Sequence, residues 1–305
     1  MKIRSILCPT DFSEFSARAL EHAVLLASRY GAELSLAHVY PLMAVMSGDA
    51  VYFPSGLPLD DSTRARLRVA LESAAEPARA AGVRTSLVVL EGDPAEEILR
   101  RARTVPTDLI VMGTHGRRGF DRWVQGSVAG RVVHKAPCAV LTVPRPPQGT
   151  PPGAAPAYAR ILCAADLRGS EAVIDAALSV ARVTEARVTV LHVVEGLSHH
   201  EATARTELAQ WPDFVELVTQ DARQRLRQAV ESRGPGVEVD RLVLCGKAYR
   251  DILDVAVARN VSLIVMGVHA QNPLERMFVG STSLHVLRLA ACPVLTVHAQ
   301  EGARA

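Results

Sequence analysis

The sequence has few aromatic residues and no long hydrophobic run, and each shortage excludes a class of protein. Phe, Trp and Tyr make up 4% of the 305 residues, too few for the stacking platforms that hold single-stranded nucleic acid. No apolar run reaches the roughly 18 residues of a membrane-spanning helix. The formal net charge of +2 lacks the basic excess typical of nucleic-acid binders. We therefore expect neither nucleic acid nor membrane as a partner.

The five cysteines do not form the motifs of a disulfide framework or a zinc ribbon. Such sites use Cys-x2-Cys pairs, and the sequence has none. Cys8 and Cys163 occupy matching apolar segments, as do Cys138 and Cys292. We interpret them as small buried residues in a reducing compartment. Residues 1–11 do not read as a signal peptide, so the predicted location is the cytoplasm.

The chain contains one unit twice, at an offset of 154 or 155 residues (192 − 38 and 166 − 11). A segment rich in proline separates the two copies and has no means of forming a core. We predict domains at 1–146 and 159–305, joined by a linker at 147–158. The matched segments are 6–8 with 161–163, 36–39 with 190–193, 110–113 with 264–267, 126–127 with 280–281, and 140–143 with 294–297.

Short apolar segments alternate with amphipathic ones in both copies. Strands that are apolar on both faces are typical of a parallel sheet covered by helices, and the alternation predicts a doubly wound α/β fold for each copy. The expected strands are 3–8, 33–40, 84–90, 108–113 and 138–143, then 159–164, 187–194, 238–244, 262–267 and 293–298. The expected helices are 13–30, 61–81, 94–104 and 126–136, then 170–183, 213–233, 248–259 and 280–290. Their expected caps are Ser13 and Asp93 at the start and Gly31 and Gly82 at the end.

A glycine pattern follows the fourth expected strand of the first copy. Gly113, Gly116, Gly126 and Ser127 give the spacing Gly-x2-Gly-x9-Gly-Ser. Glycine lets the backbone approach a ligand closely, and the free N–H groups at a helix start attract anions. The pattern predicts a phosphate-binding loop. The alternative is a surface loop with ordinary turn glycines.

These residues resemble the universal stress protein family, over nearly the whole chain and in two tandem copies. The resemblance implies an adenine-nucleotide-binding fold with strand order 3-2-1-4-5 and a regulatory role in the stress response. It also implies association across the fifth strand, either between the two copies or between the chains of a homodimer. The sequence does not identify a protein partner. The segments that carry the resemblance are 6–13, 36–39, 111–118, 126–131 and 136–143.

By position, the resemblance implies that ATP, or alternatively ADP or AMP, is the ligand. Asp11 would meet the adenine or the ribose, although it could instead be only a helix-entry residue. Val39 and Tyr40 would line the adenine pocket. Met112 and Gly113 would flank the base and the sugar.

The phosphates would lie at the glycine pattern. They could be bound with or without Mg²⁺. The residues that the resemblance places around them are Gly116, Arg117, Gly126, Ser127 and Val128. A solvated basic loop is the other interpretation of Arg117. In the second copy, Ala270 replaces the second glycine of the pattern, so we expect weaker binding there. The corresponding candidates are Asp166, Val193, Gly267, Gly280 and Ser281.

Two other functions stay open beside nucleotide-dependent regulation. One is slow Mg-dependent ATP hydrolysis, with Asp11 or His115 orienting water. The other is a nucleotide-independent scaffold that acts through domain pairing. The sequence has no Walker, nucleophile-elbow or zinc-protease motif, and we assign no catalytic residue. His38 and His192 are interpreted as structural residues at the end of a buried strand.

Overall fold

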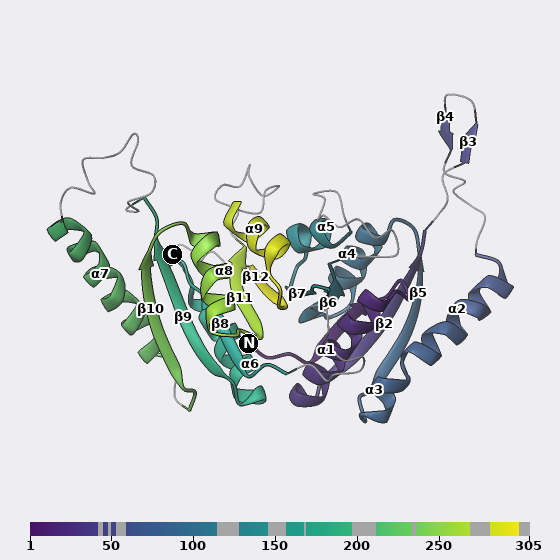
Figure 1. The fold of residues 1–305 in the computed structure, drawn as a ribbon. Helices are drawn as coiled ribbons and strands as arrows, with labels where there is room; N and C mark the ends of the chain where they lie inside the picture. Colours follow the sequence, from purple (N-terminus) through teal and green to yellow (C-terminus); the bar gives the residue numbers. More distant parts are fainter. Residues whose placement is uncertain are drawn as a thin grey trace, which may run out of the picture. The chain divides into compact units, whose positions relative to one another are not determined.

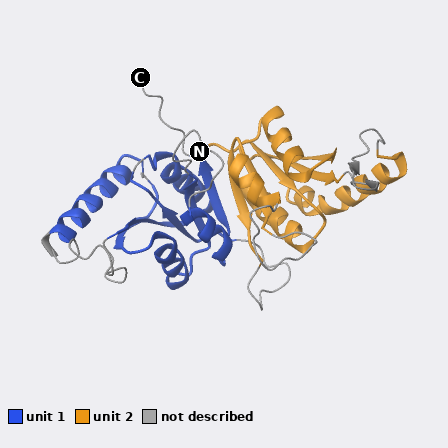
Figure 2. Cartoon of the chain, turned by 90° about the horizontal axis from the view of Figure 1, so that it is seen from above, with its two compact units in different colours: residues 1, 146–149, 157–305 blue, residues 2–145, 150–156 orange. Residues whose placement is uncertain are grey.

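A computed structural model describes residues 1–41, 45–47, 50–52, 59–114, 128–145, 157–167, 169–196, 212–233, 236–268 and 281–298. These residues form two compact units, coloured separately in Figure 2. One unit consists mainly of residues within 2–145 and the other mainly of residues within 157–305. Each unit is an α/β domain built around a parallel sheet, as the sequence predicts.

The first domain alternates strands and helices along the chain (Figure 1). Its main sheet has the order β5-β2-β1-β6-β7, with every neighbouring pair parallel. This is the order 3-2-1-4-5 that the family resemblance implies. The elements are β1 (Ser5–Pro9), α1 (Glu14–Tyr30), β2 (Glu33–Tyr40), β3 (Val45–Ser47), β4 (Ala50–Tyr52), α2 (Asp61–Ala74), α3 (Glu76–Ala80), β5 (Thr85–Glu91), α4 (Pro94–Thr104), β6 (Leu109–Gly113), α5 (Val128–Lys135) and β7 (Ala139–Val143).

The second domain repeats this arrangement. Its sheet has the order β10-β9-β8-β11-β12, again with parallel neighbours. The elements are β8 (Arg160–Ala164), α6 (Glu171–Thr184), β9 (Arg187–Val194), α7 (Pro212–Glu231), β10 (Val239–Cys245), α8 (Ala248–Ala258), β11 (Leu263–Val268), α9 (Ser281–Leu289) and β12 (Val294–His298).

The central strands are buried on both faces because helices cover both sides of each sheet. In β6 and β7 successive residues are buried without alternation, which is the pattern of a parallel sheet inside two helical layers. In the first domain α1 packs on β1 and β6, while α4 packs on β2 and β5. The core is therefore a set of branched aliphatic side chains in the strands, and polar chemistry is left to the strand ends.

The helix caps follow the sequence signals closely. The Ser13 hydroxyl accepts a hydrogen bond from the Ser16 N–H, and the Asp93 carboxylate accepts one from the Glu96 N–H. One prediction is wrong: the helix expected at 61–81 is two helices that meet at Ala75. Pro77 lies in the first turn of α3, and because proline has no N–H it cannot continue the ladder of α2.

The cysteines are thiols, and four of them are shielded from solvent. Cys8 and Cys163 are fully buried, and desolvation raises the pKa of each thiol to about 12. Desolvation likewise raises the pKa of Cys138 to about 12 and that of Cys292 to about 11. These four thiols are therefore poor nucleophiles. Cys8 and Cys163 act as small core residues, while Cys138 and Cys292 are half-buried. Among the described helices, none combines the length and the apolar character needed to cross a membrane.

The two copies end their first helices with the same backbone turn but different residues, which gives a matched test. Gly31 has φ 65° and Glu185 has φ 57°, both left-handed. No described atom lies within 4 Å of a Cβ added at Gly31, so Gly31→Ala introduces backbone strain without a clash. We expect it to destabilise the first domain by about 1 kcal/mol. Glu185→Gly should stabilise the second domain by about 0.5–1 kcal/mol.

Urea unfolding followed by circular dichroism measures both changes. The opposite signs are the essential result, since they follow from one cause. Two shifts in the same direction would contradict the assignment of left-handed caps to these positions.

Candidate functional site

The candidate site lies where the strand order of the first domain reverses. β1 pairs with β2 on one side, with Ser5 opposite Glu33, and with β6 on the other, with Ile6 opposite Leu109. Because all these strands are parallel, their carboxyl ends meet at one edge of the sheet. The chain leaves β1 toward one side of the sheet and reaches β6 on the other, and ligands of open α/β sheets bind in the crevice at such a point.

Thr10 is the centre of the hydrogen-bond network that shapes this edge. Its N–H donates to the Ala37 carbonyl at 2.8 Å. Its hydroxyl accepts from the Phe12 N–H at 3.0 Å and lies 3.0 Å from the Ser16 hydroxyl. His38 Nδ1 lies 2.7 Å from the Thr10 carbonyl oxygen, which can only accept, so Nδ1 carries the hydrogen. The loop after β1 is thereby tied to the end of β2 and to the start of α1.

This network confirms the structural interpretation of His38 and holds an unusual backbone. Phe12 has φ 61°, which is rare for a bulky residue. Its ring centroid lies 4.6 Å from that of His38, with an angle of 32° between the planes. The contact between the two tilted rings and the Thr10 hydroxyl together stabilise a turn that would otherwise cost about 1–2 kcal/mol.

The Asp11 side chain is hydrogen-bonded to Ser13, the N-cap residue of α1. One oxygen of its half-buried carboxylate accepts from the Ser13 N–H at 3.1 Å and from the Ser13 hydroxyl at 2.6 Å. Asp11 thus takes part in the entry to α1, and whether that is its only role stays untested. A contact between Asp11 and a ligand stays a prediction.

The other candidates of the first domain divide into those at the strand ends and those in the glycine pattern. Val39 and Met112 are buried, and Tyr40 and Gly113 are half-buried. Val128 is the first residue of α5. Four of these residues therefore lie at the ends of β2 and β6, and Asp11 lies just after β1. Four candidates lie outside the described residues: Gly116, Arg117, Gly126 and Ser127.

Sequence reasoning missed the contacts that fix α5, the helix that follows the glycine pattern. Arg131 Nη2 lies 2.9 Å from Asp93 Oδ1 and 2.8 Å from Glu96 Oε1. Asp93 is the N-cap residue of α4, and Glu96 lies in its first turn. Hydrogen bonds to Asp93 and Glu96 raise the pKa of Arg131. The opposite charges are visible in the sequence, but nothing there places positions 93 and 131 next to each other.

The second domain keeps the scaffold of this network and loses its hydroxyl. His192 Nδ1 lies 2.9 Å from the Ala165 carbonyl oxygen, and the Ala165 N–H donates to the Leu191 carbonyl at 2.9 Å. Ala165 stands where the first copy has Thr10. Ser170 matches Ser16 by the offset of 154 (170 − 16), and its buried hydroxyl has no partner among the described residues.

The second-domain candidates occupy the corresponding strand ends. Asp166 is exposed and Val193 is half-buried. The Gly267 carbonyl accepts from the Ser283 hydroxyl at 3.2 Å, and Ser281 is the first residue of α9. Gly280 lies outside the described residues.

Comparison with known proteins agrees with both the fold and the duplication. The model of the universal stress protein family matches residues 2–144 and again residues 157–298. The chain belongs to the universal stress protein family. It is a tandem member, with two family domains in one chain.

Individual members of the family match each half or the whole chain. A universal stress protein of Methanocaldococcus jannaschii is 37% identical over 150 residues, covering 47% of this chain and 83% of the relative. One of Bacillus subtilis is 34% identical over 143 residues, covering 45% of this chain and 97% of the relative. The crystal structure of a universal stress protein from Archaeoglobus fulgidus aligns with a TM-score of 0.69 at 21% identity, covering 98% of this chain and 100% of the other. The tandem fold is thus shared at full length.

The two matched serines test the hydroxyl network of this universal stress protein. Ser16 and Ser170 are equally buried, each 5% exposed, but only the Ser16 hydroxyl is hydrogen-bonded, to Thr10 and to the Ser13 carbonyl. We expect Ser16→Ala to destabilise the first domain by about 1–2 kcal/mol. Ser170→Ala should be neutral or slightly stabilising, because the Ser170 hydroxyl is buried, makes no cap hydrogen bond and has no partner among the described residues.

Denaturant unfolding of the two single variants gives both values. Equal losses at the two positions would show that the recorded hydrogen bonds of Ser16 do not stabilise the native state.

Proposed function

We propose that this protein is an ATP-binding regulatory protein of the stress response, with ADP and AMP as alternative ligands. One observation carries the proposal: β1 and β6 are neighbours, and the Gly-x2-Gly-x9-Gly-Ser pattern begins at the last residue of β6. A sequence suited to phosphates therefore starts at the reversal point of the sheet, where nucleotides bind in doubly wound folds. Membership of the universal stress protein family supports the same function.

The described residues suit the base and the sugar of a nucleotide. Val39 and Met112 present apolar side chains with little exposure, 8% and 5%, at the ends of β2 and β6. Gly113 has no side chain to fill the space above β6. The Asp11 carboxylate is held by Ser13 in an orientation fixed before any ligand arrives. We assign adenine to the apolar side and the ribose to the Asp11 side.

The phosphates are assigned to the glycine pattern and the start of α5. Gly116 and Gly126 would let backbone N–H groups approach phosphate oxygens. Ser127 would add a hydroxyl and Arg117 a positive charge. Arg131, through Asp93 and Glu96, anchors α5 to α4, so the helix that follows the pattern has a fixed support.

We propose that the first domain is the stronger nucleotide site. The second domain has Ala270 in place of the second glycine, and a methyl group there would obstruct the approach of phosphate. Its loop after β8 also lacks the threonine hydroxyl that braces the first site, since Ala165 replaces Thr10. Two independent differences thus weaken the same site.

Binding, and not chemistry on the nucleotide, is the proposed role of these residues. Within the described ranges, no three His, Cys, Asp or Glu side chains gather as a metal-ligand set. We assign any Mg²⁺ to the phosphates of the ligand. The segment after β6 would take one arrangement when nucleotide is bound, and the surface offered to a partner would change with it.

Counting nucleotides on the intact chain tests the proposal directly. We expect isothermal titration with ATP and Mg²⁺ to give one tight site per chain, with a second site weaker or absent. Mass spectrometry of protein purified without added nucleotide supplies an independent count. Protein that carries no nucleotide and shows no binding heat would refute nucleotide binding. Two equally tight sites would refute only the proposed asymmetry.

The glycine that differs between the copies gives a matched pair of variants. We expect Gly116→Ala to weaken ATP binding by about tenfold, because the new methyl group keeps backbone and phosphate apart. Ala270→Gly should strengthen the second site. Far-ultraviolet circular dichroism checks that both variants keep the fold. Unchanged affinity in Gly116→Ala would show that the phosphates lie elsewhere.

A further inference from the structure

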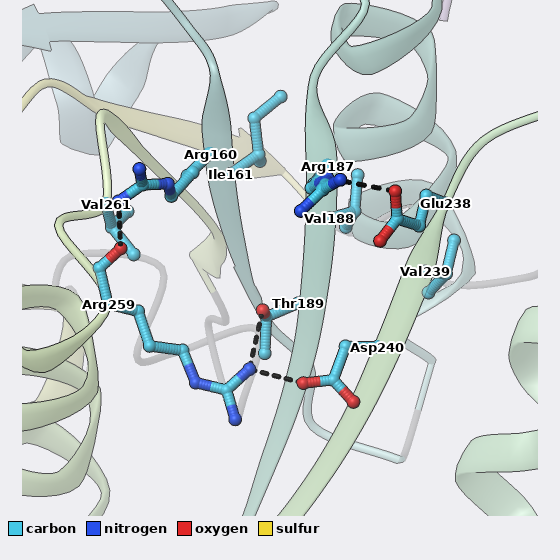
Figure 3. A pocket seen from close by; sticks show the side chains of 10 residues that line it. All are labelled: Arg160, Ile161, Arg187, Val188, Thr189, Glu238, Val239, Asp240, Arg259 and Val261. Carbon is cyan, nitrogen blue, oxygen red and sulfur yellow. Dashed lines mark hydrogen bonds and ion pairs between the residues drawn. The ribbon is translucent and has the colours of Figure 1, made fainter.

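A cavity lies at the edge of the second-domain sheet that is opposite to the nucleotide-binding candidates of that domain. Its volume is about 480 Å³, within the range of small-molecule sites. Arg160 and Arg187, the first residues of β8 and β9, line it together with Arg259 at the end of α8 (Figure 3). It therefore opens at the amino ends of the strands.

This location separates the cavity from the nucleotide candidates, which follow the carboxyl ends. β9 runs for 8 residues from Arg187 to Val194, and a strand rises about 3.3 Å per residue. The two edges are thus roughly 25 Å apart. A ligand in the cavity cannot share contacts with a nucleotide at the other edge of the same sheet.

Positive charge exceeds negative charge around the cavity. The three arginines face two carboxylates, those of Glu238 and Asp240. Arg187 Nε pairs with Glu238 at 2.9 Å, but both side chains are about 70% exposed, at 74% and 68%, and such a surface pair is weak. Arg259 Nη1 contacts Asp240 and donates to the Thr189 hydroxyl at 3.1 Å. One positive charge is left uncompensated within the lining.

Arg160 supplies that charge from a fixed position. Its backbone N–H donates a hydrogen bond to the Ser262 hydroxyl at 3.0 Å, and its carbonyl accepts one from the Ser262 N–H at 2.9 Å. Its side-chain Nη1 donates to the Arg259 carbonyl at 3.1 Å. A guanidinium has five N–H donors, and Nη1 is the only group that the described contacts engage. The remaining donors are available to an anion.

The first domain shows which of these charges the fold itself requires. There Glu33 and Arg84 form an ion pair at 3.0 Å, at the positions that match Arg187 and Glu238 but with the charges exchanged. The cross-strand pair is therefore a common structural feature. Arg160 and Arg259 have no cationic counterpart, because the matching residues are Ser5 and Val105.

We infer that this cavity binds a small organic anion with two or more carboxylates. Guanidinium groups bind carboxylates through paired hydrogen bonds, and Figure 3 shows the three arginines on different sides of the cavity rather than converging on one point. Val239 and Val261, both half-buried, add apolar surface to the lining. Several separated cations, apolar walls and this volume suit a polycarboxylate better than a single compact ion.

Isothermal titration of the full chain with citrate at constant ionic strength tests the inference. Citrate should bind at one site per chain, while acetate should not bind measurably. Arg160→Ala and Arg259→Ala should each weaken citrate binding about tenfold. Glu238→Gln should strengthen it a few-fold, because it removes a repelling carboxylate. A gain in affinity cannot arise from a damaged fold.

Arg84→Ala is the matched control, since Arg84 is an exposed arginine at the amino edge of the first domain. It should leave citrate binding unchanged, and saturating ATP should also leave it unchanged. Equal losses in Arg84→Ala and Arg160→Ala would overturn the site, because the binding would then follow overall charge. Tighter binding of inorganic phosphate than of citrate would overturn the ligand class. No citrate binding to the wild-type chain would overturn the inference whatever ATP does.

Discussion

The parallel pairing of β1 with both β2 and β6 is the constraint on which the rest of the structure depends. It brings the carboxyl ends of three strands to one edge of the sheet. It also places β2 on one side of β1 and β6 on the other. Because the central strands are buried on both faces, most of their side chains are apolar, and the polar groups of the candidate site gather beyond the strand ends. The single bond from the His38 ring to the Thr10 carbonyl, 2.7 Å long, then fixes the loop after β1 against the end of β2. The same bond recurs between His192 and the Ala165 carbonyl, so this contact is common to both domains.

The two domains differ in polar contacts while their cores stay alike. The buried positions of α1 reappear in α6 at the same offset, as with Ala23 and Ala177, both fully buried. The hydroxyl of Thr10 does not reappear, and the serine that it would meet keeps its burial without its bond. A buried group that loses its polar partner costs about 1–3 kcal/mol, which a domain with a stability of about 5–15 kcal/mol tolerates. Duplication can therefore weaken one site without unfolding the domain that carries it.

The sequence predicted the elements well because their signals are local. Caps such as Ser13 and Asp93, and short runs of mostly apolar residues in the strands, are signals that involve neighbours only a few positions away. The strand order came from the family resemblance, since periodicity does not say which strands pair. The positive φ of Phe12 was not predicted, because it depends on tertiary contacts. The break at Ala75 was also missed, although Pro77 is a local signal for it. The contact of Arg131 with α4 joins positions 38 residues apart (131 − 93), and only the packed fold reveals it.

The amino edge of the sheets shows how new charge can enter without disturbing the fold. The pair Glu33 with Arg84 and the pair Arg187 with Glu238 connect the same two strands with opposite polarity. Exchanging both charges preserves the attraction. The sheet therefore requires opposite charges at these two positions, but either strand can carry the positive one. In the second domain, Arg187 on β9 lines one cavity together with Arg160 and Arg259. In the first domain, the position that matches Arg187 is Glu33. In the proposed site, the two arginines without a cationic counterpart in the first domain, Arg160 and Arg259, thus decide which domain holds an anion at this edge.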